Sequence, residues 1–455
     1  MTTNILFLTI DGLRADKFHG VHKTAITPKI DSIIKNGTYF NQAISCADGT
    51  TLSLNTIFSG MFPFRTGTRS KEVHMFKSNY IHLLKNNGYH IYGVIPELTS
   101  LSRFRFNFEN SINSFKATPP DVEHIWEGTG EKILNLLSQE KMKEPWLCYI
   151  HPLDLHDPLV VPEKFDDESY GESAYERVLS SIDNWIGRII ESVDLSKTII
   201  VVTADHGNII PEGGLGYTDF EPEFRNEINV GKKILPKFTH KIGANALVYA
   251  RNKIREKRLE KANKGLTSYQ KRSRLPYFRL TLFDEAIRVP LLFLGKNIKK
   301  NKIIKNQVCN ADIFPTILDM INIKDSSRRD GRSLIPYFND NEIEEENIYI
   351  HTMPYEEESE YDKVGIRTSN YKYFRHARNA VENVNLYDLR NDPLENVNIA
   401  EQNQEIVKDM ERLLSEMTEN FSIDNMEKID DARLEKIQDE LRLLGYKKTW
   451  KDKSN

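Results

Sequence analysis

Residues 198–208 read TIIVVTADHGN, an uninterrupted apolar run that ends directly in a polar Asp-His-Gly segment. An apolar run without alternation is typical of a strand that is covered on both faces, as in the centre of a parallel sheet. Residues 4–16, NILFLTIDGLRAD, repeat the arrangement, with Asp11 and a glycine following the apolar run. Because the carboxyl ends of parallel strands meet at one edge of a sheet, the two polar loops are expected to converge there.

Further apolar runs alternate with helical patterns along the chain. Residues 146–150 and 289–294 predict two more buried strands, and residues 91–95 predict a shorter one. Apolar residues at helical spacing predict helices over residues 27–35, 52–58, 80–86, 174–193 and 311–321. The first of these is expected to begin with Thr27 as its N-cap and Pro28 at its first position. The alternation predicts an α/β fold with a mostly parallel central sheet flanked by helices.

Two regions depart from this alternation. Residues 229–280 are strongly basic, with only Glu256 and Glu260 as acidic residues. A smaller C-terminal portion begins near residue 348, after an acidic stretch, and residues 405–446 have the pattern of two charged amphipathic helices. We therefore expect a catalytic domain over residues 1–347 that carries the basic insertion, and a C-terminal α+β subdomain with a helical tail over residues 348–455.

Composition excludes several classes of protein. A net charge of −4 over 455 residues is too small to indicate a nucleic-acid partner. No apolar run is long enough to cross a bilayer, and residues 1–10 lack the basic lead and cleavage site of a signal peptide, which predicts a cytoplasmic location. Cys46, Cys148 and Cys309 are few and far apart, so neither a disulfide framework nor a zinc knot is indicated. Cys148 lies in an apolar run and is expected to be a buried thiol.

Several segments, taken in order, resemble the sulfatase family of the alkaline phosphatase superfamily. They are IDGLRAD (10–16), TPKIDSIIKNGTYFNQA (27–43), SGMFPFRTG (59–67), TADHGN (203–208), LFDEAIRVPLL (282–292), DIFPTILD (312–319), DGRSLIP (330–336), KVGIRTSNYKYF (363–374) and LYDLRNDPLENVNIA (386–400). The resemblance implies an alkaline-phosphatase-like α/β domain with a small C-terminal subdomain bearing a short antiparallel sheet. It also implies a metal-dependent enzyme that hydrolyses or transfers a sulfate or phosphate ester.

Asp11, Asp205 and His206 are the candidate metal ligands that follow buried strands. Carboxylate oxygen and imidazole nitrogen are common ligands of divalent metals. In isolation, Asp11 could equally be a turn or capping residue, and the Asp205-His206 pair a solvated loop. The resemblance places Asp11 and the pair in the family's two metal-binding loops and adds Thr50 as a fourth ligand. Gly12 stands where calcium sulfatases have a second aspartate, so one ion of Mn, Mg, Zn or Ca is expected.

Thr50 also occupies the position of the family's nucleophile. Active sulfatases carry Cys or Ser there, in a C/S-x-P-S-R motif whose first residue is oxidised to formylglycine. Residues 50–54 read TTLSL, and threonine cannot become formylglycine. A threonine resembles instead the nucleotide pyrophosphatases, lipoteichoic acid synthases and lipid A phosphoethanolamine transferases, which implies a threonine nucleophile acting on a phosphoester. The alternatives are that Thr50 only caps a helix, or that the register shifts to Thr51.

His156 and Arg279 are the candidates for contact with the substrate. HDPLVVP, residues 156–162, resembles the family's HxPxxxP segment, which implies that His156 contacts the ester oxygens or protonates the leaving group. A purely structural histidine is the alternative, and His151 and Asp154 are weaker candidates nearby. Arg279, or Leu280 after a one-residue slip, stands where the family has a Lys or His. Arginine can pair with a sulfate or phosphate oxygen but cannot bind a metal.

Three hypotheses for function follow. The first is a hydrolase or transferase that acts through a threonine on a phosphoester of a glycan or lipid. The second is a sulfuric ester hydrolase without formylglycine, and the third is an inactive sulfatase-like protein that binds a glycan or a protein. The basic insertion could concentrate an anionic polysaccharide or lipid head group, hold the protein at the periphery of an anionic membrane, or be an ordinary solvated surface. The oligomeric state is not predicted.

Overall fold

A computed structural model describes residues 3–68, 73, 79–109, 114–119, 121–138, 142–211, 253–254, 256–274, 281–341, 343–353, 362–419, 435–437, 439–440 and 443. The chain forms two compact units. The first comprises Met1–Ile209 and Phe278–Asn455, and the second comprises Ile210–Tyr277. Arg279 and Leu280, together with most of the basic insertion, lie outside the described residues.

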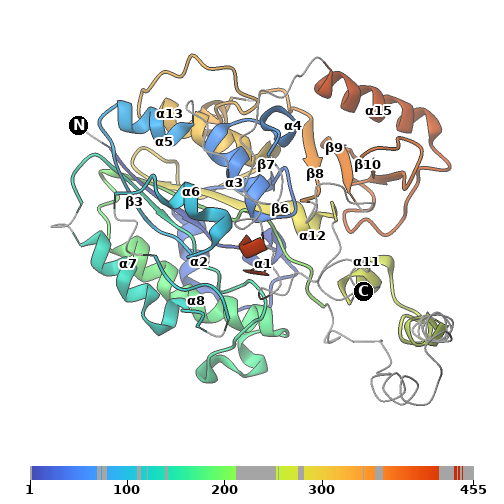
Figure 1. Ribbon diagram of the computed structural model, residues 1–455, viewed down its shortest axis with the longest axis horizontal. Coiled ribbons are helices and arrows are strands. Elements are labelled where there is room, and N and C mark those ends of the chain that lie inside the picture. The colour runs from blue at the N-terminus through green and yellow to red at the C-terminus, as the bar shows by residue number, and fades with distance from the viewer. Residues whose placement is uncertain are drawn as a thin grey trace. The chain divides into compact units, whose positions relative to one another are not determined.

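The first unit contains a seven-stranded sheet with the order β3-β4-β1-β5-β6-β2-β7 (Figure 1). Its strands are β1 (Asn4–Thr9), β2 (Gly37–Ile44), β3 (His90–Val94), β4 (Trp146–Ile150), β5 (Thr198–Thr203), β6 (Arg288–Gly295) and β7 (Lys302–Cys309). The pairs β3/β4, β4/β1, β1/β5 and β2/β7 are parallel, and only the two pairs made by β6 are antiparallel. The predicted mostly parallel α/β sheet is therefore confirmed.

Helices cover both faces of this sheet (Figure 1). On one side α2 (Pro28–Lys35) and α7 (Thr129–Leu137) pack against the long α8 (Ala174–Glu191). On the other side α5 (Tyr80–Asn86) and α13 (Ile313–Met320) pack against α3 (Thr50–Ser59). Shorter helices are α1 (Ala15–Phe18), α4 (Pro63–Thr66), α6 (Ser102–Arg105), α12 (Asp284–Ile287) and α14 (Ile335–Phe338). Single 3₁₀ turns are η1 (Thr99–Leu101), η3 (Ile125–Glu127), η4 (Glu163–Phe165), η5 (Glu168–Tyr170) and η7 (Asn310–Asp312).

The start of α2 differs from its prediction in one respect. Pro28 occupies the first turn as expected, and Ile30, Ile33 and Ile34 are buried, but the Thr27 side chain makes no capping hydrogen bond. Its hydroxyl accepts instead from Lys23 Nζ at 2.9 Å. Thr27 therefore occupies the predicted N-cap position, but its side chain does not cap the helix and pairs with the Lys23 ammonium group instead.

An aromatic cluster fixes α3 to the sheet. The ring of Phe58 in α3 lies 6.0 Å from Phe7 in β1, 5.2 Å from Tyr149 in β4 and 5.1 Å from Phe314 in α13, measured between centroids. Aromatic pairs at these separations contribute attraction beyond the area that they bury. The cluster therefore sets where the first residue of α3 lies relative to the ends of β1 and β4.

The C-terminal portion of the first unit is an antiparallel sheet with the order β11-β10-β9-β8 (Figure 1). Its strands are β8 (Ile348–His351), β9 (Lys363–Arg367), β10 (Tyr371–His376) and β11 (Asn385–Asp388), and α15 (Gln404–Thr418) packs on β9 and β10. The expected short antiparallel sheet is confirmed. Helix α15 corresponds to the first predicted helix of the tail, while most of the second lies outside the described residues.

The second unit is described at residues 210–211, 253–254 and 256–274. It includes α11 (Ser268–Ser273), which begins with a capping box. Thr267 accepts from the Gln270 backbone N–H, and the Gln270 side chain accepts from that of Thr267. Part of the basic insertion is therefore helical. A role of the insertion at an anionic surface stays a prediction.

Candidate active site

Thr50 is the first residue of α3, and its side chain faces the edge of the sheet. Gly49 occupies the N-cap position, and no side chain caps the helix. The Thr50 hydroxyl donates to Asp11 Oδ2 at 3.1 Å and lies 3.3 Å from His206 Nε2. Capping of α3 by Thr50 is therefore wrong. The hydroxyl meets two predicted metal ligands instead, at a helix N-terminus where the backbone contributes positive potential.

Asp11 and Asp205 lie side by side because β1 and β5 are parallel neighbours in register, with Thr9 opposite Thr203. Both carboxylates are buried, with 1% and 0% of the residue exposed. Asp205 Oδ1 accepts from the backbone N–H of Gly12 at 3.3 Å. Gly12 has a φ of +68°, a left-handed conformation that suits glycine and turns the chain away from the strand end.

Two imidazoles complete the cluster. His151 follows β4, the other neighbour of β1, and its Nε2 lies 3.2 Å from Asp11 Oδ2 while its Nδ1 meets the Tyr149 hydroxyl at 2.7 Å. His206 Nδ1 donates to the Gly207 carbonyl at 2.6 Å. His206 Nε2 therefore faces the carboxylates, 3.8 Å from Asp11 Oδ1 and 3.6 Å from Asp205 Oδ2. The structure thus unites the four predicted ligands and moves His151 from a weaker candidate into the centre of the site.

The cluster fits a divalent cation. One ligand atom each from Asp11, His151 and Asp205 lie within 4.8 Å of one another. Asp11 Oδ1 and Asp205 Oδ2 are among the described buried side-chain atoms that have no hydrogen-bond partner. Burying an uncompensated carboxylate oxygen is costly, and a bound cation removes that cost. A mixture of carboxylate, hydroxyl and imidazole donors suits Zn, Mn or Mg.

The electrostatics agree with a site for positive charge. Burial raises the pKa of Asp11, but the hydrogen bond from His151 and the charges of His206 and His156 together hold that pKa well below its usual range. Burial and the Asp11 charge raise the pKa of Asp205. Burial alone would lower the pKa of His206, yet the Asp205 and Asp11 carboxylates raise it above 6.5. Two close carboxylates therefore draw a cation or a proton to the point where they meet.

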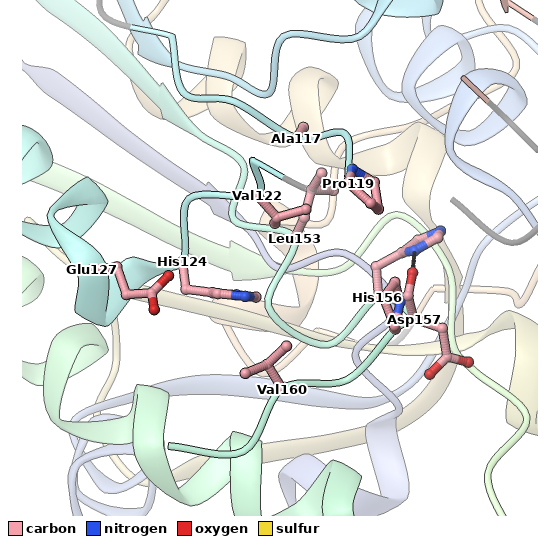
Figure 2. Close-up of a pocket in the computed structure, with 10 residues that line it drawn as sticks. Ala117, Pro119, Val122, His124, Glu127, Leu153, His156, Asp157 and Val160 are labelled. Atoms are coloured by element: carbon pink, nitrogen blue, oxygen red, sulfur yellow. Dashed lines mark hydrogen bonds between the residues drawn. The ribbon is translucent and has the colours of Figure 1, made fainter. Parts of the chain in front are cut away.

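His156 lies on the loop that leaves β4 and is 9% exposed. Its Nδ1 donates to the Asp157 carbonyl at 2.7 Å, and its ring lines a cavity of about 290 Å³ (Figure 2). Its positive charge is one of the causes of the lowered pKa of Asp11. Asp154, a weaker candidate, has a structural role, because it accepts from the Ile125 backbone N–H at 2.9 Å.

Asp48 is a residue near the site that sequence reasoning missed. Its carboxylate accepts from the backbone N–H groups of Met353 at 2.6 Å and Thr281 at 2.8 Å. Burial raises the pKa of Asp48 to about 6 despite these hydrogen bonds. The residue therefore ties the chain just before α3 to two distant segments, and no spacing in the sequence signals such a role.

Comparison with known proteins agrees with this geometry. The profile described as "Sulfatase" matches residues 3–323, and that described as "N-sulphoglucosamine sulphohydrolase, C-terminal" matches residues 277–420. Arylsulfatase K of Mus musculus is 29% identical over 145 residues, which cover 30% of this chain and 26% of the mouse protein. The match thus spans only about a quarter of that relative's length.

Two solved structures share the fold. A "2-O GAG sulfatase" superposes with a TM-score of 0.64 and 17% identity, covering 95% of this chain and 96% of the other. The phosphonate monoester hydrolase of Agrobacterium radiobacter gives a TM-score of 0.61 and 16% identity, covering 91% and 95%. At these identities the likeness concerns the fold alone. Because the family profile covers well over half of the chain, the protein belongs to the sulfatase family, whose members are metal-dependent ester hydrolases with the alkaline-phosphatase-like fold.

Proposed function

We propose that this protein hydrolyses or transfers a phosphoester through Thr50, with one divalent metal ion held by Asp11, Asp205, His206, Thr50 and His151. The observation that carries the proposal is the position of the Thr50 hydroxyl, 3.1 Å from Asp11 Oδ2 and 3.3 Å from His206 Nε2 at the start of α3. A bound divalent cation would lower the pKa of that hydroxyl and offset negative charge on the ester oxygens.

The chain's own residues supply the remaining steps. The Thr50 hydroxyl gives up its proton to solvent, and its oxygen forms a bond to phosphorus. The bond from phosphorus to the leaving oxygen breaks, and His156 donates a proton to that oxygen. The N-terminus of α3 stabilises the negative charge that develops on the ester oxygens. Water, or an acceptor hydroxyl in a transferase, then gives a proton to His156 and attacks phosphorus. The bond from phosphorus to the Thr50 oxygen breaks, and that oxygen regains a proton from solvent. Arg279 is proposed to pair with an ester oxygen, as its position in the sequence predicts.

A sulfuric ester hydrolase is the second candidate. Family membership and similarity to proteins named arylsulfatase K and "2-O GAG sulfatase" favour it. Similarity to a phosphonate monoester hydrolase and the presence of a residue that cannot form formylglycine favour the phosphoester. The third hypothesis, an inactive binding protein, gives no reason for two buried carboxylate oxygens to lack partners at the proposed metal site.

The setting of the reaction remains part of the proposal. Within the described part of the chain, no helix is both long and apolar enough to cross a membrane. The cytoplasmic location, the peripheral membrane contact and the glycan or lipid carrying the ester stay predictions from the sequence.

An activity panel tests the proposal. Wild type and Thr50→Ala would be assayed with Mn, Mg, Zn and Ca on nitrophenyl phosphate, bis(nitrophenyl) phosphate, nitrophenyl phosphonate and nitrophenyl sulfate. We expect metal-dependent turnover of a phosphorus ester that Thr50→Ala abolishes. Turnover of the sulfate alone would establish the second candidate, and metal-dependent turnover that survives in Thr50→Ala would refute the role of Thr50.

A further inference from the structure

Beside His156 lies a cavity of about 290 Å³ that the proposed reaction does not by itself explain (Figure 2). Most of its wall is apolar and comes from two separate segments of the chain. The first contributes Ala117, Pro119 and Val122, and the second contributes Leu153, Pro158 and Val160. Figure 2 shows Val122 and Leu153 on one side of the His124 ring and Val160 on the other. Ligand pockets typically have volumes of roughly 300–1,000 Å³, so this one suits a single small group rather than a chain of sugars.

One loop links the lining of the cavity to the candidate active site. Residues 151–158 run from His151, which contacts Asp11, to His156, Asp157 and Pro158, which line the cavity. The same loop is held to the first metal loop, because the Asp11 backbone N–H donates to the Pro152 carbonyl at 3.1 Å. A group bound in the cavity therefore lies beside the residue proposed to protonate the leaving oxygen. This is where the organic part of an ester would lie.

Acidic side chains outnumber lysine and arginine among the described residues around the cavity. Glu127 and Asp157 line the cavity. The buried Asp154 contacts the lining residue His124, with 3.4 Å between Asp154 Oδ1 and His124 Nδ1. No lysine or arginine is among the described residues of the lining. Lys116, next to the lining residue Ala117 in the sequence, is paired with Asp121 at 3.6 Å. The two imidazoles are also engaged, His124 with Asp154 and His156 with the Asp157 carbonyl.

The wall is held in place by its own contacts. The rings of His124 and Trp126 stack at 4.6 Å with an interplanar angle of 4°, and the Ile125 backbone N–H between them donates to Asp154 Oδ1. A binding wall fixed in this way loses little conformational freedom when a ligand enters. Because the wall is rigid, the kinds of side chain in it decide which ligands bind.

We infer that this cavity is a subsite for the organic part of the ester, and that it accepts one small uncharged or cationic group and rejects an anionic one. The inference rests on the proposed function for its place in the reaction, and it goes beyond that function by naming the substrate class. It argues against a polysulfated or polyphosphorylated glycan with a second anionic group next to the scissile ester. An anionic group in this largely apolar cavity is repelled by the Glu127 and Asp157 carboxylates, and among the described lining residues only the two imidazoles could offset its charge.

Binding of three phenols to the wild-type protein tests this inference without requiring turnover. The probes are phenol, 4-hydroxybenzoate and (4-hydroxyphenyl)trimethylammonium, titrated at pH 8 by calorimetry and followed by competition between pairs. We expect the neutral and cationic probes to bind at least about tenfold more tightly than the anionic one, which corresponds to roughly one close charge interaction. Equal binding, or tighter binding of 4-hydroxybenzoate, would overturn the inference.

Two variants and a control locate the binding. Val160, which lines the cavity and is 43% exposed, would be replaced by lysine, and we expect Val160→Lys to reverse the preference toward 4-hydroxybenzoate. Glu127→Gln should reduce the discrimination without reversing it. The matched control is Val381→Lys, 86% exposed in the turn between β10 and β11, which should leave all three affinities unchanged. If Val160→Lys leaves the order of affinities unchanged, the cavity is not the binding site.

Failure of this inference and failure of the proposed function give different results. If the ordering of the phenols holds while no aryl phosphate is turned over with any metal, the proposed function fails and the subsite stands. If aryl phosphates are turned over but the anionic phenol binds best, the subsite assignment fails and the proposed function stands.

Discussion

The hydroxyl oxygen of Thr50 lies 3.1 Å from Asp11 Oδ2, although 39 positions separate the two residues in the chain. Asp11 follows β1, and Thr50 begins α3, whose Phe58 packs on the same strand through Phe7. The contact therefore results from a helix fixed across the sheet with its N-terminus at the carboxyl ends of the strands. A side chain at that point can meet both a bound cation and a substrate anion.

Gly207 positions the Asp205-His206 loop against α12. Its backbone N–H donates to the Ala286 carbonyl at 2.7 Å, and a Cβ at residue 207 would lie 2.2 Å from the Glu285 carbonyl oxygen. Because that oxygen belongs to the backbone, Gly207→Ala must displace the loop and the two proposed metal ligands on it. We expect metal affinity to fall by roughly 10–100-fold, the size of effect seen when ligand orientation is disturbed. Competition with a chromophoric chelator measures it, and wild-type affinity in a folded variant would show that the loop does not hold the metal.

Tyr149 orients His151 through the 2.7 Å contact between its hydroxyl and Nδ1. Partners of this kind fix the tautomer and direction of a metal-binding imidazole. Tyr149→Phe should therefore lower metal affinity by roughly 10–100-fold. The matched control is Tyr89→Phe, which removes a buried hydroxyl that donates to the Thr3 carbonyl at 2.8 Å, away from the site. Equal losses in the two variants would mean that His151 is not a ligand and that the effect is general.

Lys372, in strand β10 of the C-terminal sheet, forms an ion pair with Asp284 at the start of α12. Its fully buried ammonium group contacts Asp284 and lies 2.7 Å from Glu395 Oε1. Lys372→Met leaves two buried carboxylates without this cation, and removing one partner of a buried ion pair typically costs about 3–5 kcal/mol. Denaturant unfolding measures the loss. Lys29→Met, which breaks an exposed pair with Glu191, is the control and should change stability little. Similar small effects in both variants would contradict a stabilising role for Lys372.

Glu395 makes the stability of this network depend on pH. Burial, together with the neighbouring Asp284 and Glu285 charges and against the attraction of Lys372, raises the pKa of Glu395 from 4.5 to about 7. The folded state therefore binds more protons than the unfolded state between these values, so the contribution of Glu395 to stability falls as pH rises from 4.5 to 7.

Glu395→Gln removes that titration while keeping the shape of the side chain. The unfolding free energy of the variant minus that of wild type should therefore increase by about 1–3 kcal/mol from pH 5 to pH 8. Denaturant unfolding of both proteins at the two pH values measures the difference. A difference that does not change with pH, or that changes in the opposite direction, would show that Glu395 is ionised throughout.

Sequence reasoning reached the fold and brought together the proposed metal ligands because both depend on strand ends. Buried apolar runs identified β1, β4 and β5, and each is followed by a polar residue that the parallel sheet brings to one edge, so Asp11, Asp205 and His206 could be named in advance. Strands β2 and β7 were not predicted. In β7 the first half is mostly partly or fully exposed and includes Lys302, Lys305 and Asn306, so it lacks a buried apolar run. The reversed direction of β6 also has no local signal, since direction depends on the path of the connection.

The rest of the site depends on contacts between distant segments. Asp48 acts through the backbone N–H groups of Thr281 and Met353, and the cavity wall pairs residues near position 120 with those near 155. Because every residue except proline has a backbone N–H group, the residues that donate these hydrogen bonds need no particular side chain and show no pattern in the sequence. The central position of His151 likewise follows from β4 being the neighbour of β1, which the order of strands along the chain does not reveal.

The most direct test of the account is to look for the covalent adduct on Thr50. Metal-loaded protein would be mixed with a turned-over phosphorus ester, quenched in acid, digested, and mapped by mass spectrometry. The account predicts a phosphoryl or phosphonyl group on the peptide containing residue 50, which is absent without metal and absent in Thr50→Ala. A group attached to any other residue, or unimpaired turnover by Thr50→Ala, would contradict it.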